Sequence, residues 1–198
     1  MKAAVLHAIG APMTIEDIPD PEPGPTDLIL RVGACGICGT DLHMSENSNP
    51  DLGWRVLPPD CVMGHEFAGE VVEVGREAQT LWHVGDRVTA LPWIGCDDCP
   101  ACRVGRGYRC ARVISRASHA LPGAYADYCR VGGGESIRLP DTVSFREGAL
   151  VEPLAVGLNA VRRARLQPAD RVLIVGAGPV GLTIAMWCRF FGAQHIVV

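Results

Sequence analysis

A short stretch near residue 40 carries four side chains that could do chemistry together. Cys38 offers a thiol, Thr40 a hydroxyl, Asp41 a carboxylate and His43 an imidazole. Thiolates and imidazoles hold zinc in proteins, and an imidazole can carry a proton near neutral pH. The pattern therefore indicates a metal or proton-transfer site, placed at the end of a predicted strand, Leu28–Val32.

Two other interpretations of this stretch stay open on the residues alone. Cys35 and Cys38 could be packing residues, since free cysteine is among the most buried residue types. They could also form a redox pair, although no βαβ pattern surrounds them. The metal interpretation gains from His65, Glu66 and Glu152, which could complete a site with Cys38.

A second group of cysteines has the spacing C-x-x-C-x-x-C followed by a fourth cysteine. Four thiolates on a short loop can close a tetrahedral zinc site with no open position, which is the structural arrangement. The residues between them are loop formers with little apolar content, so the metal would supply the folding energy. An iron–sulfur cluster is the alternative, but the fourth spacing favours zinc. The predicted ligands are Cys96, Cys99, Cys102 and Cys110.

The end of the chain carries a glycine-rich turn between two strands. A buried-strand pattern, Arg171–Val175, leads into G-x-G-x-x-G, an apolar helix to about Phe191 and a second strand at residues 195–198. This order is the dinucleotide fingerprint, whose glycines allow a tight turn and a close approach of the pyrophosphate. A helix packed through glycines is the alternative. The predicted cofactor-binding residues are Gly176, Gly178, Pro179, Val180 and Gly181.

Short strands divided by glycine and proline position these groups. They indicate an all-β barrel or sandwich for the first part of the chain. A helix is predicted from Phe145 to Val161, interrupted at Glu152-Pro153, where Glu152 could also be a carboxylate favoured by the helix N-terminus. Residues 44–60 are predicted to form a loop. The predicted strands are Lys2–His7, Met13–Asp17, Leu28–Val32, Phe67–Val74, Arg87–Leu91 and Ala124–Val131.

Bulk composition limits the classes of function. The 198 residues are 48% hydrophobic and 20% charged, as in an ordinary globular protein, and the net charge of −4 argues against a nucleic-acid partner. The apolar stretch Val172–Met186 is broken by glycine and proline, which argues against a membrane span. With no signal peptide, nine cysteines indicate metal binding rather than disulfides. We therefore expect a cytoplasmic protein.

These motifs, in this order, resemble the zinc-dependent medium-chain alcohol dehydrogenase family, in its polyol, sugar and threonine dehydrogenase branch. The resemblance implies an α+β catalytic domain over residues 1–155, a GroES-like β-barrel with a structural zinc lobe. It also implies that residues 156–198 are the first βαβ portion of an α/β Rossmann domain, truncated and therefore incomplete. The fold class is thus expected to change near residue 155.

The resemblance also assigns the metal ligands. Cys38, His65 and Glu152 would hold a catalytic zinc, with glutamate where the alcohol dehydrogenase branch has cysteine. Glu66 would be a supporting carboxylate or an alternative ligand. The four cysteines described above would hold a structural zinc, so two zinc ions are expected.

The mechanism implied by the resemblance uses the first stretch. Zinc would act as a Lewis acid on the alcohol, and the nicotinamide would accept hydride. Thr40 would take the alcohol proton and pass it through the cofactor ribose to His43 and solvent. Asp41 would hydrogen-bond His65 and fix its tautomer. Alternatively, Thr40 and Asp41 cap a helix after Cys38, and both roles can hold.

The expected function is hydride transfer between a secondary alcohol or polyol and NAD or NADP. The alternative is a catalytically inactive, zinc-stabilised fragment that acts as a binding or structural module. The expected partner is a small-molecule alcohol or polyol, without nucleic acid or membrane, and the full-length protein is expected to be a homodimer or homotetramer. Neither the alcohol nor the choice of NAD over NADP can be predicted, because residues 195–198 contain no acid that could select the cofactor.

Overall fold

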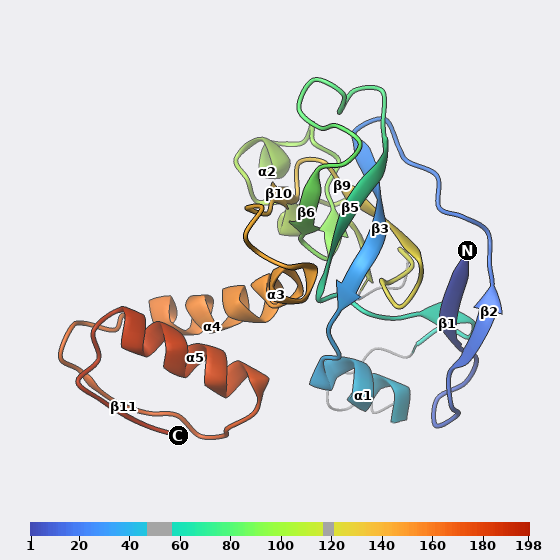
Figure 1. Cartoon of the computed structure of the whole chain (residues 1–198). Coiled ribbons are helices and arrows are strands. Elements are labelled where there is room, and N and C mark those ends of the chain that lie inside the picture. The colour runs from blue at the N-terminus through green and yellow to red at the C-terminus, as the bar shows by residue number, and fades with distance from the viewer. Residues whose placement is uncertain (47–56, 117–120) are drawn as a thin grey trace. The chain divides into compact units, whose positions relative to one another are not determined.

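The computed structural model describes residues 1–46, 57–116 and 121–198, which form two compact units (Figure 1). The first unit is Met1–Ala149 and the second is Leu150–Val198. The predicted domain boundary, between residues 155 and 156, falls just after this division and inside a helix of the second unit. Among the described residues, no helix combines the length and apolarity that a membrane crossing requires.

A five-stranded antiparallel sheet forms the centre of the first unit, in the order β10-β6-β5-β3-β9. Its main core holds Leu28, Leu30, Phe67 and Val131, all fully buried. Gly69 of β5 lies so close to the carbonyl of Arg31 that no side chain fits there. The strands are β3 (Asp27–Cys35), β5 (Phe67–Val74), β6 (Arg87–Ala90), β9 (Tyr128–Gly132) and β10 (Ser136–Arg138).

Smaller sheets flank this one. A three-stranded sheet has the order β2-β1-β4, and a two-stranded sheet, β7-β8, frames the segment that carries the four cysteines. Within that segment lie a short helix, α2, and a 3₁₀ turn, η2. The bounds are β1 (Lys2–Leu6), β2 (Thr14–Asp17), β4 (Cys61–Val62), β7 (Trp93–Ile94), α2 (Pro100–Arg103), η2 (Gly107–Arg109) and β8 (Ile114–Ser115).

Two helices complete the first unit, α1 (Gly39–Glu46) and α3 (Phe145–Ala149). Helix α1 corrects the prediction of a loop from residue 44, because the helix continues through Glu46; the rest of that predicted loop up to residue 56 lies outside the described residues. Helix α3 packs on the central sheet, where the Phe145 ring lies against Gly33 of β3. The predicted strand at Ala124–Val131 begins only at Tyr128, because Gly123, Ala124 and Tyr125 donate hydrogen bonds to the carbonyls of residues 62–64 instead.

The second unit has the order α4 (Val151–Ala164), β11 (Arg171–Leu173), α5 (Pro179–Phe190) and β12 (His195–Val197). Strands β11 and β12 pair in parallel, so β11, α5 and β12 form the predicted βαβ unit. Helix α4 packs on α5, with Gly157 against Thr183. The predicted helix is interrupted, but at Leu150 rather than at Glu152-Pro153. One helix ends at Ala149 and the next starts at Val151, with Pro153 in its tolerant first turn.

Candidate metal centres

The four predicted cysteines come together in one lobe of the first unit. The Sγ atoms of Cys96, Cys99, Cys102 and Cys110 all lie within 4.8 Å of one another, and all four are free thiols. Helices α2 and η2 bury no side chain of their own. The lobe therefore lacks an apolar core, and its donor set fits a tetrahedral zinc ion that would hold it together.

Neighbouring groups adjust the acidity of these thiols. A backbone N–H of Cys102 lowers the pKa of Cys99 to about 7, while the Asp98 carboxylate raises the pKa of Cys96 to about 12. The Arg112 guanidinium lies 3.1 Å from Cys96 Sγ and pairs with Asp98. The Arg112 backbone N–H lies 3.3 Å from Cys110 Sγ. Arg112 thus contacts two of the four sulfurs, Cys96 with its side chain and Cys110 with its backbone N–H.

A second cluster joins Cys38, His65 and Glu66. One ligand atom from each lies within 4.8 Å of the others. Sheet pairing explains the encounter, because Cys35 at the end of β3 lies opposite Phe67 at the start of β5. The loop after β3 and the residues before β5 must therefore meet. A thiol, an imidazole and a buried carboxylate form a donor set that fits zinc.

Asp41 connects the two segments of this cluster. Its Oδ1 atom lies 3.3 Å from Nδ1 of His65, and its Oδ2 atom accepts the backbone N–H of Cys38 at 3.1 Å. Because Nδ1 of His65 faces the carboxylate, Nε2 is the ring atom available for a metal ion.

Charge and burial set the protonation of this pair. Burial opposes ionisation of Asp41, but hydrogen bonds from His65, Tyr125 and Cys38 lower its pKa. Burial would lower the pKa of His65, but the hydrogen bond to Asp41 raises it to about 9. The Asp41 carboxylate thus favours the protonated form of His65. A metal ion would displace its Nε2 proton.

The remaining predicted site residues lie on helices. Thr40 and His43 are exposed on α1, three residues apart and hence on one side of the helix. The Thr40 backbone N–H lies 3.5 Å from Cys38 Sγ. Glu152 lies in the first turn of α4, in the second unit. Its role as a zinc ligand, and the proton path through Thr40 and His43, stay predictions.

The other cysteines lie outside both clusters. Cys61 and Cys129 are buried in the cores of the first unit, where they act as packing residues. Cys35 packs against the main core, and burial raises its pKa to about 12. Sequence reasoning missed Tyr125 and Arg112, which contact the two clusters. A single tyrosine or arginine gives no pattern that could have revealed them.

The glycine-rich turn lies between β11 and α5. Gly176 has φ +109°, and Gly181 lies so close to the Gly176 carbonyl that a side chain would collide with it. A Cβ atom at Gly178, the N-cap of α5, would meet nothing within 4 Å. The first turn of a helix leaves backbone N–H groups without intrahelical partners, so the open space at Gly178 agrees with the predicted pyrophosphate site. Pro179 and Val180 open the helix beside it.

Comparisons with known proteins agree with both parts of this description. The family model described as the alcohol dehydrogenase GroES-like domain matches residues 24–141. Sorbitol dehydrogenase from Bacillus subtilis (strain 168) is 38% identical over 198 residues, covering 100% of this chain and 55% of the relative. L-threonine 3-dehydrogenase from Aeromonas hydrophila is 37% identical over 200 residues, covering 100% of this chain and 56% of the relative.

A solved structure supports the same conclusion. A protein described as a zinc-binding dehydrogenase from Sinorhizobium meliloti 1021, bound to NADP, aligns with a TM-score of 0.83 and 35% identity, covering 98% of this chain and 54% of that chain. The predicted fold, a GroES-like catalytic domain followed by the start of a Rossmann domain, is therefore confirmed. The chain spans about half the length of the curated relatives it matches.

Proposed function

The chain belongs to the zinc-dependent medium-chain alcohol dehydrogenase family, and on this premise we propose that it supplies the zinc sites and the start of the dinucleotide site of an oxidoreductase. The reaction is hydride transfer between a secondary alcohol or polyol and NAD(P). The sorbitol and threonine dehydrogenases among the relatives support this substrate class. The full-length enzyme is proposed to be a homodimer or homotetramer in the cytoplasm.

The observation that carries the proposal is the meeting of Cys38, His65 and Glu66 around one point, with Asp41 behind the imidazole. Zinc, when bound there, supplies Lewis-acid chemistry, and NAD(P) supplies the hydride acceptor. Asp41 fixes the His65 tautomer, and we assign Glu152 as a third ligand. Glu66, buried beside Cys38 and His65, is a supporting carboxylate or an alternative ligand.

The proton of the alcohol needs a path to solvent. In our proposal the Thr40 hydroxyl accepts it, and His43 releases it to water after it has crossed the cofactor ribose. The exposure of both side chains on one side of α1 is compatible with such a path. A histidine suits the last step because its ordinary pKa is near neutral.

Zinc stoichiometry tests the two metal sites. Native mass spectrometry of this chain should show two zinc ions, falling to one in Cys38→Ala and to about one in Glu152→Ala. Cys61→Ala removes a buried cysteine outside both clusters and should retain two zinc ions. One zinc ion in the parent chain would leave only the four-cysteine lobe, and the catalytic assignment would be withdrawn.

Cofactor binding separates an oxidoreductase from an inactive zinc-stabilised module. Trp187 lies in α5 and donates to the Leu154 carbonyl at 2.7 Å, so its fluorescence reports on the helix that follows the glycine turn. Titration with NAD or NADP should quench this fluorescence with saturation. Loss of quenching in Gly178→Val, in which the side chain fills the open space, would place the cofactor at that turn. Absence of quenching in the parent would favour the inactive module.

A further inference from the structure

Tyr125 contacts every segment that builds the Cys38–His65 cluster. Its backbone N–H donates to the Met63 carbonyl at 2.9 Å, and its carbonyl accepts the Ala4 N–H at 2.8 Å. Its ring lies against Gly64, where a Cβ atom would stand 2.7 Å from the ring. Gly64 has φ +96° and directly precedes His65. The tyrosine is thus held in place by β1 and by the segment that carries His65.

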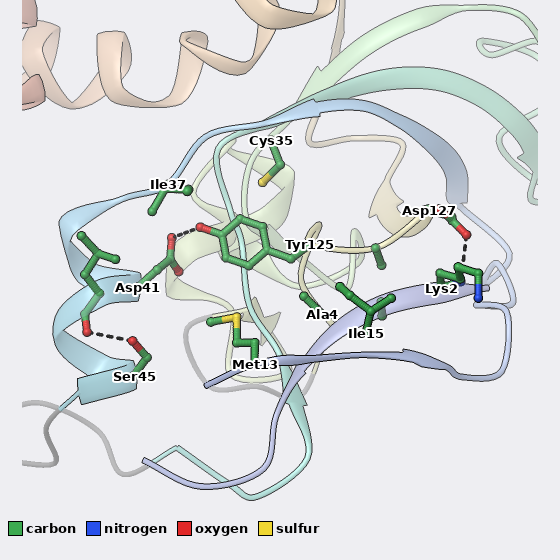
Figure 2. A pocket seen from close by; sticks show the side chains of 13 residues that line it. Lys2, Ala4, Met13, Ile15, Cys35, Ile37, Asp41, Ser45, Tyr125 and Asp127 are labelled. Carbon is green, nitrogen blue, oxygen red and sulfur yellow. Dashed lines mark hydrogen bonds between the residues drawn. The ribbon is translucent and has the colours of Figure 1, made fainter. Parts of the chain in front are cut away.

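The hydroxyl of Tyr125 reaches the other half of the cluster. It lies 2.9 Å from Oδ2 of Asp41 and 3.1 Å from the Gly36 carbonyl. Figure 2 shows the hydroxyl directed at Asp41, which projects from α1. Asp41 is only 5% exposed, so its carboxylate depends mainly on protein donors.

Asp41 therefore depends on Tyr125 for its orientation. One carboxylate oxygen faces His65, and the other accepts both the Cys38 N–H and the Tyr125 O–H. A buried carboxylate that loses one donor turns toward other partners or takes up a proton. Either change would alter the carboxylate that contacts both the His65 ring and the backbone of Cys38.

Tyr125 also borders a cavity of about 690 Å³ within the first unit (Figure 2). Met13, Ile15 and Ile37 line this cavity together with Tyr125 and Asp41. The cavity is large enough for a single aromatic ring, and its lining is mainly apolar. A small phenol placed there could take the position of a truncated Tyr125 side chain.

We propose that Tyr125 is a positioning residue of the metal centre, whose hydroxyl orients Asp41 and thereby sets the metal affinity of Cys38 and His65. The inference rests on the proposed zinc function of these two residues and adds a group that acts through Asp41 rather than on the metal. Outer hydrogen-bond partners of this kind typically change metal affinity about 10–100-fold.

The test measures the affinity of each zinc ion by chelator competition, with native mass spectrometry as the readout. In Tyr125→Phe, one zinc ion should bind about 10–100-fold more weakly, while the zinc ion of the four-cysteine lobe stays unchanged. Tyr128→Phe is the matched control, because it removes a half-buried tyrosine hydroxyl from β9 and should leave both affinities unchanged. Cobalt substitution adds a spectroscopic readout, since altered ligand orientation should shift the visible bands of the weakened site.

Chemical rescue separates the effect of the Tyr125 hydroxyl on zinc affinity from the effect of ring packing. Tyr125→Ala should lose affinity at the same site, p-cresol should restore it, and toluene, which lacks the hydroxyl, should not. Parent-like affinity and cobalt bands in Tyr125→Phe would overturn the role of Tyr125 while leaving the metal centre in place. A parent chain that binds no zinc at Cys38 and His65 would overturn the proposed function, and this inference with it.

Discussion

Single charged side chains control the thiols of the four-cysteine lobe. A zinc ion bound by four thiolates carries net negative charge, and a nearby guanidinium offsets it. Arg112 is placed for this, with its side chain at Cys96 and its backbone N–H at Cys110. Arg109, by contrast, is exposed and lies over the Tyr108 ring.

Arg112→Gln should therefore weaken zinc retention in the lobe. We expect about tenfold faster transfer of this zinc ion to a chromophoric chelator, because one charge-assisted contact to a thiolate is lost. Arg109→Gln removes a charge from the same lobe without touching a thiol and should release zinc at the parent rate. If both variants released zinc equally fast and faster than the parent, the overall charge of the lobe, and not the contact of Arg112 with the thiols, would control zinc retention.

A second residue-scale effect concerns acid stability. The Ser144 hydroxyl and backbone N–H both donate to Glu147 at the start of α3, and these hydrogen bonds lower the pKa of Glu147 from its ordinary 4.5. A lowered pKa in the folded state stabilises the protein above the unfolded-state pKa. This contribution is lost as the pH falls through the folded-state value.

Glu147→Gln should thus be less stable than the parent at pH 7. The difference in urea midpoint should shrink as the pH falls below 4.5 and disappear once the pH is below the lowered pKa of the folded state. Glu46→Gln, an exposed change at the end of α1, serves as the control and should show no such convergence. A difference that stays constant down to pH 3 would exclude the Glu147 carboxylate as its source.

The three glycines of the dinucleotide turn have different reasons to be glycine. Gly176 needs its positive φ, Gly181 lies against the Gly176 carbonyl, and Gly178 borders open space. Gly181→Ala should therefore destabilise the second unit by about 1–3 kcal/mol through overpacking. Urea unfolding followed by Trp187 fluorescence measures this effect. Gly178→Ala should unfold at nearly the parent midpoint, and a loss equal to that of Gly181→Ala would contradict the assignment.

Sequence pattern predicted most elements because their signals are local. The strand Phe67–Val74, the helix break before Pro153 and the strand–glycine–helix order of the second unit follow from alternation, proline and glycine. The sequence could not show that strand β9 begins at Tyr128 instead of at the predicted Ala124. Its hydrogen bonds go to residues 62–64, and such a partner is set by the tertiary fold.

The candidate site was predictable to a similar extent. Cysteine and histidine spacing indicated the metal ligands, because few other patterns use these residue types. The links between them were harder to predict, since Tyr125 reaches Asp41 across 84 positions of sequence. A hydroxyl that acts through a carboxylate leaves no spacing pattern, so only coordinates reveal it.

At the scale of the whole molecule, the two units differ in how much surface they bury. Residues of β3 and β5 are mostly buried, whereas β11 and β12 form a two-stranded sheet of mainly exposed residues. Val175 is 94% exposed and Phe190 is 75% exposed. The second unit therefore leaves large apolar side chains uncovered.

Hydrogen exchange on this chain should reveal the difference. Amides of β11 and β12 should exchange about tenfold or more faster than those of β3 and β5, because few buried contacts hold the short sheet. The amides of the core strand β6 should exchange as slowly as those of β3 and β5. Equal protection in β5 and β12 would show that the second unit is as stable as the first.

The pairing of β3 with β5 sets the distance between Cys38 and His65. Two register shifts, between Ile29 and Leu30 and between Val32 and Ala34, set which residues face each other at the strand ends. A slip of two residues would carry His65 about 7 Å away from Cys38, beyond the reach of one shared ion. A zinc ion held by both residues, as we propose, would favour the chain in this register over one in which the strands have slipped.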